Sequence, residues 1–280
     1  MIAVALALCG ALLYGIADFG GGLATKRAAV LVVVPASQFS GLVVLTPFLL
    51  LGPGQADATS IAWGAAAGVA GGLGLMLFYR SLANGTMSVV APLTAVTAAA
   101  VPVLAGIALG ERPAALVAVG VVVALVAVVL VSAEGGRLPR PRQLLTDPAT
   151  GGALTAGAAF GLFFVLISRS SPDSGLWPLL GARTASVVLL VGLALAVRPR
   201  LPHRSGWPLI LALGVADTAA NALFLLASRY GLLTITGVLI ALYPVSTVLL
   251  AQTVLRERIS HLQLGGLAAA VAAVALIAAG

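Results

Sequence analysis

Residues 115–131 read ALVAVGVVVALVAVVLV, a run of seventeen residues without one polar side chain. A transmembrane strand would alternate apolar and polar positions over about ten residues, and this run does not alternate. A helix that is apolar on every side is instead typical of a protein core or a membrane span. Together with its flanks, the segment 113–133 has the length of about 20 apolar residues that a spanning helix needs, so we predict that it crosses a membrane.

Similar apolar runs recur along the whole chain and are separated by short polar or Gly/Pro-containing segments. Of the 280 residues, 61% are hydrophobic and 8% are charged, whereas an ordinary soluble domain has about 25% charged residues. We therefore predict an all-α integral membrane protein with ten transmembrane helices. The predicted spans are 2–23, 29–51, 60–82, 88–109, 113–133, 151–169, 176–197, 206–228, 232–254 and 261–279.

The segments between these spans are short, and the longest lies around residues 133–152. We therefore expect no soluble catalytic or ligand-binding domain. The first segment has no basic region and no cleavage pattern, so we interpret it as a retained helix. Cys9 is the only cysteine, which excludes an intrachain disulfide. The net charge of +7 comes from basic residues scattered beside the spans, a pattern that favours membrane topology over nucleic-acid binding.

The chain matches itself without a gap at an offset of 146 residues. Gly15 then aligns with Gly161, Phe78 with Phe224, and Glu111-Arg112 with Glu257-Arg258. Chance identities are common in such a composition, but the paired Glu-Arg and Phe in one register favour a true repeat. We predict two five-helix repeats, residues 1–134 and 147–280, joined by a basic linker at 135–146. Because five is odd, the second repeat must be inverted, a plan that recurs in secondary transporters.

The basic residues also predict an orientation, since Lys and Arg concentrate on the cytoplasmic side of a membrane. One set of loops and helix ends holds eleven of them, and the other set holds four, which are Arg112, Arg169, Arg183 and Arg229. By this count both termini lie outside the cell.

Two stretches resemble a known family. They are APLTAVTAAAVPVLAGIALGERP (91–113) and GVLIALYPVSTVLLAQTVLRERIS (237–260), each a proline-bearing helix that leads into Glu-Arg. With the ten helices and the 5+5 repeat, they make the chain similar to the drug/metabolite transporter superfamily, in its EamA-like branch. One departure is that Ala98 occupies the position where the family pattern places a proline in the first copy; the second copy has Pro244.

The resemblance implies a secondary transporter in the inner (plasma) membrane that exports amino acids, other metabolites or drugs, with possible coupling to an ion gradient. It implies no cofactor and no metal. It also implies cytoplasmic termini, which conflicts with the charge count, so the orientation stays open between the two. The substrate, the coupling ion and the choice between monomer and homodimer stay open as well.

Asp217 lies at the middle of the predicted span 206–228, and Asn221 follows it by four residues on the same helix face. Ionisable residues inside a membrane are costly and are functional candidates by default. Asp217 is therefore our first candidate for a protonatable site or a polar contact with the solute. The alternative is a structural interhelical hydrogen bond.

Asp18 lies roughly 7 to 8 Å from the middle of the first span, at 1.5 Å per residue. It is a candidate gate or coupling residue beside three glycines, or else a salt-bridge partner of Lys26, Arg27 or Arg80. Three further candidates accompany it at that face of the membrane, namely Tyr14, Tyr79 and Arg80. Arg80 has the alternative of extending to the lipid headgroups.

Prolines mark two other helices as cavity walls or bending elements, because proline frees a backbone carbonyl that must find another partner. These helix-bending candidates are Pro92, Pro102 and Pro244, and Tyr243 beside Pro244 is a further candidate contact for the solute. Gly64, Gly68 and Gly72 form a small-residue stripe that predicts close helix packing within the monomer. Glu111 and Glu257 fall at helix ends, where a capping role is favoured over a catalytic one.

These features are compatible with three functions to different degrees. A secondary transporter, with a cavity between the repeats, fits the inverted repeat and the mid-membrane Asp217. An intramembrane enzyme fits poorly, because the two histidines, His203 and His261, belong to no motif for a metal site or an activated nucleophile. The remaining alternative is a membrane assembly or partner protein that transports nothing.

Overall fold

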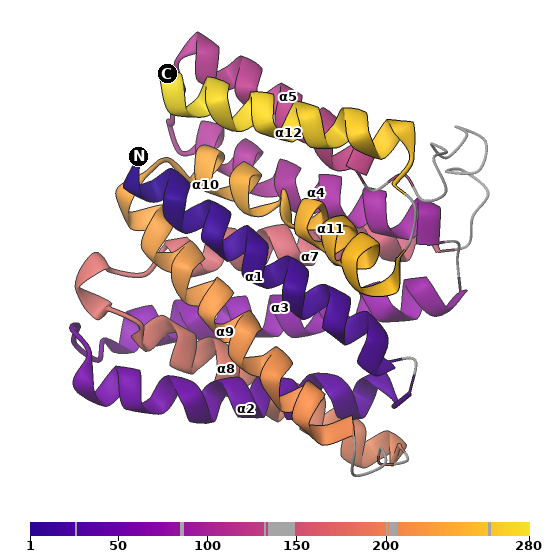
Figure 1. Cartoon of the computed structure of the whole chain (residues 1–280). Coiled ribbons are helices and arrows are strands. Elements are labelled where there is room, and N and C mark those ends of the chain that lie inside the picture. Colours follow the sequence, from indigo (N-terminus) through magenta and orange to yellow (C-terminus); the bar gives the residue numbers. More distant parts are fainter. Residues whose placement is uncertain are drawn as a thin grey trace.

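The computed structural model describes residues 1–25, 27–84, 87–131, 133, 149–199, 201, 206–256 and 259–280, without the side chains of residues 79, 82–84, 87–89, 91 and 92. Within this part of the chain the structure is helical and contains no strand (Figure 1). The helices are α1 (Ile2–Thr25), α2 (Val30–Leu51), α3 (Ala58–Asn84), α4 (Met87–Ala108), α5 (Ala115–Val131), α7 (Thr150–Ser168), α8 (Trp177–Val197), α9 (Trp207–Tyr230), α10 (Leu233–Ile240), α11 (Tyr243–Leu255) and α12 (His261–Ala279), with a 3₁₀ turn, η2, at Pro172–Ser174.

In the described residues, eight segments are long and apolar enough to cross a membrane, and two further apolar helices are shorter. The all-helical, multi-pass prediction is thus confirmed, whereas ten full-length spans are not observed. The predicted span 88–109 corresponds to α4 (Met87–Ala108), whose stretch with described side chains is Leu93–Ala108, and the predicted span 113–133 corresponds to the shorter α5 (Ala115–Val131). At 1.5 Å per residue, the seventeen residues of α5 extend about 26 Å, slightly less than the roughly 30 Å of a hydrocarbon core.

The predicted span 232–254 is interrupted in the structure. Its first part, α10, ends at Ile240, and α11 begins at Tyr243, with Pro244 in the first turn of α11. Proline is tolerated there because the first backbone N–H groups of a helix have no partner within it. By contrast, α4 is one continuous helix through Pro92 and Pro102.

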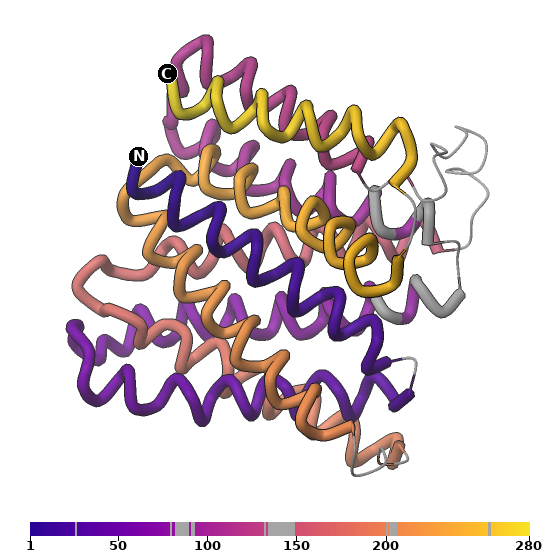
Figure 2. The backbone as a smooth tube through the Cα atoms, in the orientation of Figure 1, coloured from indigo at the N-terminus to yellow at the C-terminus, as the bar shows by residue number. Residues whose placement is uncertain are grey.

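The helices of the N-terminal half pack mainly on those of the C-terminal half. Among the described residues, α1 packs on α9, α10 and α11, α2 on α8 and α9, α3 on α7 and α8, α4 on α7 and α10, and α5 on α12. Figure 2 shows the same interleaving, with indigo and purple tubes lying between orange and pink ones. The two halves therefore form one bundle rather than two separate domains.

The small-residue stripe of α3 lies against α8 of the same chain, as predicted. A Cβ atom on Gly64 would meet the backbone of Pro178, and one on Gly68 would meet the backbone of Ala182. The absence of side chains thus lets two helices approach closely, which stabilises helix pairs in a membrane.

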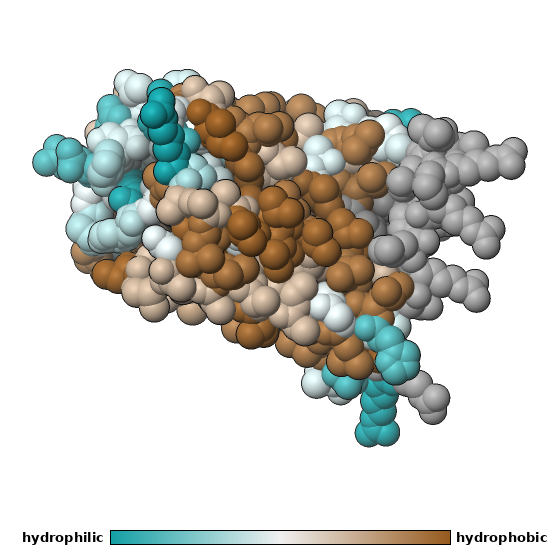
Figure 3. Space-filling model, turned by 90° about the horizontal axis from the view of Figure 1, so that it is seen from above, coloured by the Kyte–Doolittle hydropathy of each residue, from teal (hydrophilic) through white to brown (hydrophobic). Residues whose placement is uncertain are grey.

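Apolar residues cover the middle of the molecular surface in the view of Figure 3, and hydrophilic residues gather toward its ends. Large apolar side chains that are exposed in the isolated chain include Phe48, Val122, Val188, Leu195 and Val271. In a membrane, lipid tails would cover such a belt, so this exposure is expected of a spanning protein and needs no partner protein.

Both termini lie at one end of the bundle (Figure 1), and polar contacts join the two halves there. The backbone N–H of Gln55 donates to the carbonyl of Asp173 (2.9 Å), and the N–H of Ser171 donates to Oγ of Ser60 (2.9 Å). The Glu111 carboxylate accepts the N–H groups of Leu233 (2.6 Å) and Thr234 (2.8 Å), which caps the N-terminus of α10. This capping by Glu111 confirms the role that its position at a helix end favours.

Candidate functional site

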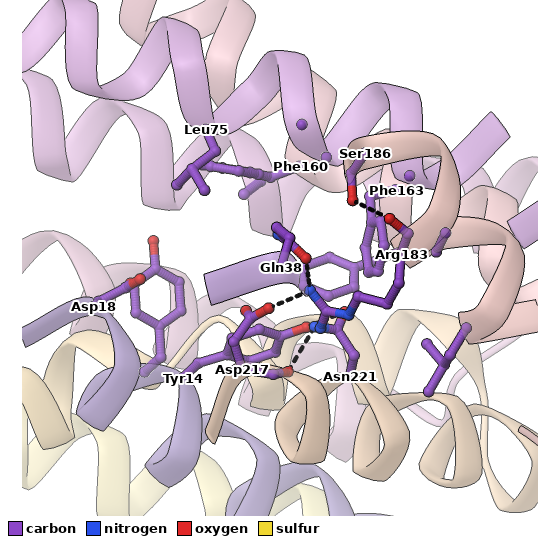
Figure 4. A pocket seen from close by; sticks show the side chains of 18 residues that line it. Tyr14, Asp18, Gln38, Leu75, Phe160, Phe163, Arg183, Ser186, Asp217 and Asn221 are labelled. Carbon is purple, nitrogen blue, oxygen red and sulfur yellow. Dashed lines mark hydrogen bonds and ion pairs between the residues drawn. The ribbon is translucent and has the colours of Figure 1, made fainter. Parts of the chain in front are cut away.

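A cavity of about 800 Å³, its open mouth included, lies between the two halves of the bundle. Side chains from both halves face it, and they come from α1, α2, α3, α4, α7, α8, α9 and α11 (Figure 4). Its eighteen lining residues are Tyr14, Asp18, Gln38, Gly68, Gly71, Gly72, Leu75, Ala98, Phe160, Phe163, Phe164, Leu179, Ala182, Arg183, Ser186, Asp217, Asn221 and Tyr243. Three of these residues are charged.

The centre of the polar part is an ion pair between α8 and α9. Nη1 of Arg183 lies 2.6 Å from Oδ2 of Asp217, and the same nitrogen donates to Oε1 of Gln38 from α2. The side chain of Arg183 is only 5% exposed, whereas that of Asp217 is 30% exposed. A buried guanidinium is very costly without a counter-ion, and the Asp217 carboxylate is the counter-ion of Arg183.

A hydrogen-bond chain continues from this pair toward α1. Nδ2 of Asn221 donates to the backbone carbonyl of Asp217 (2.7 Å), and the hydroxyl of Tyr14 donates to Oδ1 of Asn221 (2.7 Å). The amide of Asn221 therefore has a fixed orientation, because its oxygen accepts from Tyr14 and its nitrogen donates to the backbone. The chain ties α1 to α9 across the boundary between the two halves.

Asp18 differs from Asp217 in its surroundings. Its carboxylate lines the cavity one turn beyond Tyr14, and no hydrogen bond or ion pair joins it to another residue of the described segments. Arg27, one of its predicted salt-bridge partners, makes no such contact, and Lys26 lies outside the described residues. The cavity thus presents one carboxylate with a cationic partner and one without.

The opposite part of the cavity is apolar. Phe160, Phe163 and Phe164 of α7 face Leu75 and three glycines of α3. The rings of Phe163 and Phe164 lie 5.5 Å apart, and Phe164 lies 4.4 Å from Phe224. Edge-on and tilted contacts of this kind are favourable between aromatic rings. Phe163 and Phe224 therefore hold the ring of Phe164 in place.

The structure brings together five of the sequence-predicted site residues in the cavity: Tyr14, Asp18, Asp217, Asn221 and Tyr243. It does not bring in Arg80, which is exposed near the end of α3. The side chains of Tyr79 and Pro92 lie outside the described residues. Pro102 does not face the cavity, and its ring packs where Gly237 of α10 leaves room for it.

Sequence reasoning missed Arg183 and Gln38 of the ion-pair network, as well as the aromatic residues Phe160, Phe163 and Phe164. Arg183 was assigned to the membrane edge because it lies seven positions inside the start of a predicted span, and this assignment is wrong. The side chain is turned into the bundle, where Asp217 compensates its charge. Gln38 lies near the middle of the span 29–51, where an amide is also costly, but unlike Asn221 it has no ionisable residue one helical turn away that draws attention to it.

Within the described residues, no group of three or more His, Cys, Asp or Glu side chains comes together in a way that would hold a metal ion. The chemistry of the cavity therefore rests on one ion pair, one further carboxylate, two phenols, two amides and an aromatic surface.

The described residues form a multi-pass helical bundle with charged side chains in a central cavity, as a membrane transport protein requires. The family comparison agrees with this class. Residues 1–133 and 149–279 match the EamA-like transporter family, and the chain belongs to that family. No curated protein matches the chain. A solved structure described as "Crystal structure of protein" is similar, with 20% identity and a TM-score of 0.80 over 99% of this chain and 98% of that one, which supports the fold alone.

Proposed function

We propose that the protein is a secondary active transporter that exports small organic solutes across the inner (plasma) membrane by alternating access. The observation that carries this proposal is the cavity itself, which both halves of the chain line and which holds the charges of Arg183, Asp18 and Asp217 inside the membrane. Charges at such depth face a bundle interior or a watery cavity and mark pathways for solutes or ions.

The packing of the helices supports two inverted repeats, 1–134 and 147–280, with five membrane-crossing segments each. At the offset of 146 residues, the pair α3 and α7 corresponds to the pair α9 and α1, and α3 with α8 corresponds to α9 with α2. These contacts between the halves thus have equivalents with the roles exchanged. Rocking of one repeat against the other would then open the cavity to one side of the membrane at a time.

Two features of the bundle are suited to such a motion. Gln55, Ser60 and Glu111 of the first half bind the second half at the end that holds the termini. The break between α10 and α11 lies beside Tyr243, which lines the cavity. A helix that is already interrupted can change its angle there without losing further backbone hydrogen bonds.

Proton coupling through an intramembrane carboxylate forms part of the proposal, and the contacts favour Asp18 over Asp217, our first candidate, for this role. Protonation of Asp217 would leave the buried Arg183 without its counter-ion, which is costly. Protonation of Asp18 breaks no contact within the described residues. We assign no catalytic reaction to the chain.

Transport by purified protein in liposomes tests this function. A panel of amines, amino acids, carboxylates and nucleosides is supplied outside the vesicles with and without an imposed pH gradient. We expect at least one solute to accumulate beyond its level in protein-free liposomes, and we expect Asp18→Asn to abolish the dependence on the pH gradient. Asp173→Asn, which removes an exposed carboxylate from the loop before α8, serves as the control and should change nothing.

The alternative function is that of a membrane assembly or partner protein that transports nothing. Its signature would be the absence of flux for every solute of the panel with protein that is monodisperse and folded. Such a result would overturn the transport proposal.

A further inference from the structure

The lining of the cavity is symmetric in position and asymmetric in chemistry. Four pairs of lining residues stand 146 positions apart in the sequence: Tyr14 with Phe160, Asp18 with Phe164, Gly71 with Asp217, and Leu75 with Asn221. In every pair, one member is polar or charged and the other is apolar or glycine. The two halves thus contribute the same backbone positions but opposite side chains.

The polar and apolar members sort onto two different walls. Tyr14 and Asp18 belong to α1, Asp217 and Asn221 belong to α9, and these two helices pack on each other. The apolar members belong to α3 and α7, which also pack on each other. Figure 4 shows this arrangement, with Leu75, Phe160 and Phe163 on one side of the cavity and Asp18, Asp217 and Asn221 on the other.

A solute that satisfies both walls has a polar head and an apolar body. Phe160, Phe163 and Phe164 offer ring faces and edges to a flat or aliphatic body, while glycines at positions 68, 71 and 72 keep α3 free of bulk beside them. Apolar ligand pockets generally place a few polar groups so that they fix the orientation of the ligand. The remaining question is the charge of the head.

The charges of the lining residues answer that question. Arg183 and Asp217 neutralise each other at 2.6 Å, and Asp18 is the only other charged residue among the eighteen that line the cavity. With both carboxylates ionised, the cavity carries a net charge of −1. A monovalent cation restores neutrality, whereas an anion would add a second uncompensated charge in a region of low dielectric constant.

A carboxylate on the solute would need Arg183, and the geometry disfavours this. Nη1 of Arg183 is already shared between Asp217 and Gln38. Nη2 has no hydrogen-bond partner, but it is shielded from solvent, so a solute could not reach it without displacing the side chain. The ion pair therefore braces α8 against α9 and leaves Asp18 as the accessible charge.

From these observations we propose that the cavity binds a monovalent organic cation, an amine with an aromatic or aliphatic body. Its ammonium group lies at the carboxylate of Asp18, and its body lies against Phe160, Phe163 and Phe164. Aromatic faces add cation–π attraction to a nearby ammonium group. This inference rests on the proposed transport function only for its biological purpose, because binding is measured without transport.

Acidification should weaken binding, because a protonated Asp18 no longer attracts an ammonium group. The titratable and charged groups that line the cavity near it are Tyr14 on its own helix, Asp217 on α9, Tyr243 on α11 and Arg183 on α8, while α2 contributes the uncharged Gln38. Tyrosines keep their protons at neutral pH, and Asp217 is paired with Arg183. Loss of amine binding on acidification should therefore report Asp18.

Four probes with related structures test the charge and the body separately. Purified full-length protein in nanodiscs is titrated at pH 7.5 with 2-phenylethylamine, 3-phenylpropionate, phenylalanine and ethylamine. We expect 2-phenylethylamine to bind at least about tenfold more tightly than 3-phenylpropionate and phenylalanine, since a charge pair in a partly dehydrated site is worth a factor of that order. We expect a similar preference over ethylamine, because only the phenyl group buries apolar surface against the aromatic wall.

Variants then assign the two ends of the solute. Asp18→Asn should weaken 2-phenylethylamine by about tenfold or more, Asp18→Glu should retain most of the affinity, and the exposed-loop control Asp173→Asn should change nothing. Phe163→Ala should weaken 2-phenylethylamine and leave ethylamine unaffected, because ethylamine has no body to place on the ring. If Asp18→Asn fails to fold, the ranking of the four probes on the unmodified protein and its loss on acidification still decide the question.

Two results would overturn the inference: tighter binding of 3-phenylpropionate or phenylalanine than of the amine, or amine binding that a folded Asp18→Asn variant retains in full. A flux measurement distinguishes failure of the cation-binding inference from failure of the transport proposal. Accumulation of a carboxylate or zwitterion with no amine binding would leave transport standing and remove the cation class. Amine binding that depends on Asp18, without flux of any solute, would support the cation site and overturn the transport proposal.

Discussion

At the scale of single residues, Arg183 and Asp217 illustrate how a charged side chain can be stable at the centre of a membrane protein. The guanidinium is almost fully buried, and the carboxylate that compensates it comes from the neighbouring helix α9. Asp217 is also partly open to the cavity, so its removal has two separable effects. One is a loss of fold stability, and the other is a change in the charge that a solute meets.

A double-mutant cycle measures the first effect, the contribution of the ion pair to the stability of the fold. Asp217→Asn leaves the Arg183 charge without its partner and should cost about 2 to 3 kcal/mol of stability, below the roughly 3–5 kcal/mol of a fully buried pair because Asp217 is partly exposed. Adding Arg183→Gln removes the orphaned charge, so the double variant should unfold at a higher temperature than Asp217→Asn alone. Thermal unfolding monitored by tryptophan fluorescence measures this. Additive losses would show that the pair contributes no coupling energy.

The sequence predicted five lining residues, because a carboxylate, an amide or a tyrosine stands out within an apolar span. It could not predict the partners of these residues, since Arg183 and Asp217 are 34 positions apart and Gln38 and Arg183 are 145 positions apart. Such pairs depend on which helices become neighbours. Depth along a helix is visible in the sequence, but the direction in which a side chain turns is not.

At the scale of the helices, close approach between α3 and α8 depends on where glycine is required and where it is not. A Cβ atom on Gly68 would lie within 2.6 Å of Cα of Ala182, too close for any real contact. A Cβ atom on Gly72 would lie 3.5 Å from Cβ of Ser186, an ordinary van der Waals distance. Two members of one glycine stripe are thus predicted to respond differently to the same substitution.

We expect Gly68→Ala to destabilise the protein by about 1 to 3 kcal/mol, because the helices must move apart or bend to admit the methyl group. Gly72→Ala is the matched control, and it should be neutral or slightly stabilising, since alanine favours a helix by up to about 1 kcal/mol relative to glycine. The midpoints of thermal unfolding of both variants in the same detergent check this. Equal losses in the two variants would contradict the observed packing of α3 on α8.

The sequence predicted which segments form helices, but it predicted only in part where a helix is interrupted. Long apolar runs require a helix in lipid, because every backbone N–H and C=O group must be satisfied within the segment. Pro244 and Pro102 read alike in the sequence, yet a break precedes Pro244 whereas α4 continues through Pro102. The sequence does not distinguish the two cases, and α2 also continues through Pro35 and Pro47.

At the scale of the whole molecule, the distribution of charge between the two ends predicts an orientation. Arg27, Arg80, Arg198 and Arg256 lie at helix ends opposite the termini, while Arg112, Arg169 and Arg229 lie at the end that holds them. Because Arg183 belongs to the cavity, the count from the sequence becomes eleven basic residues against three. The structure therefore strengthens the bias on which the positive-inside rule acts.

We accordingly expect both termini on the outer face of the membrane, although the resemblance to the family implied cytoplasmic termini. Alkaline phosphatase fused after Gly280 should be active, and green fluorescent protein fused at the same position should stay dark. Fusions within the linker 135–146 provide the reciprocal control and should reverse both signals. Fluorescence after Gly280 would place the termini in the cytoplasm, and the contacts of Glu111 with α10 would then lie on the cytoplasmic side of the bundle instead of the outer side.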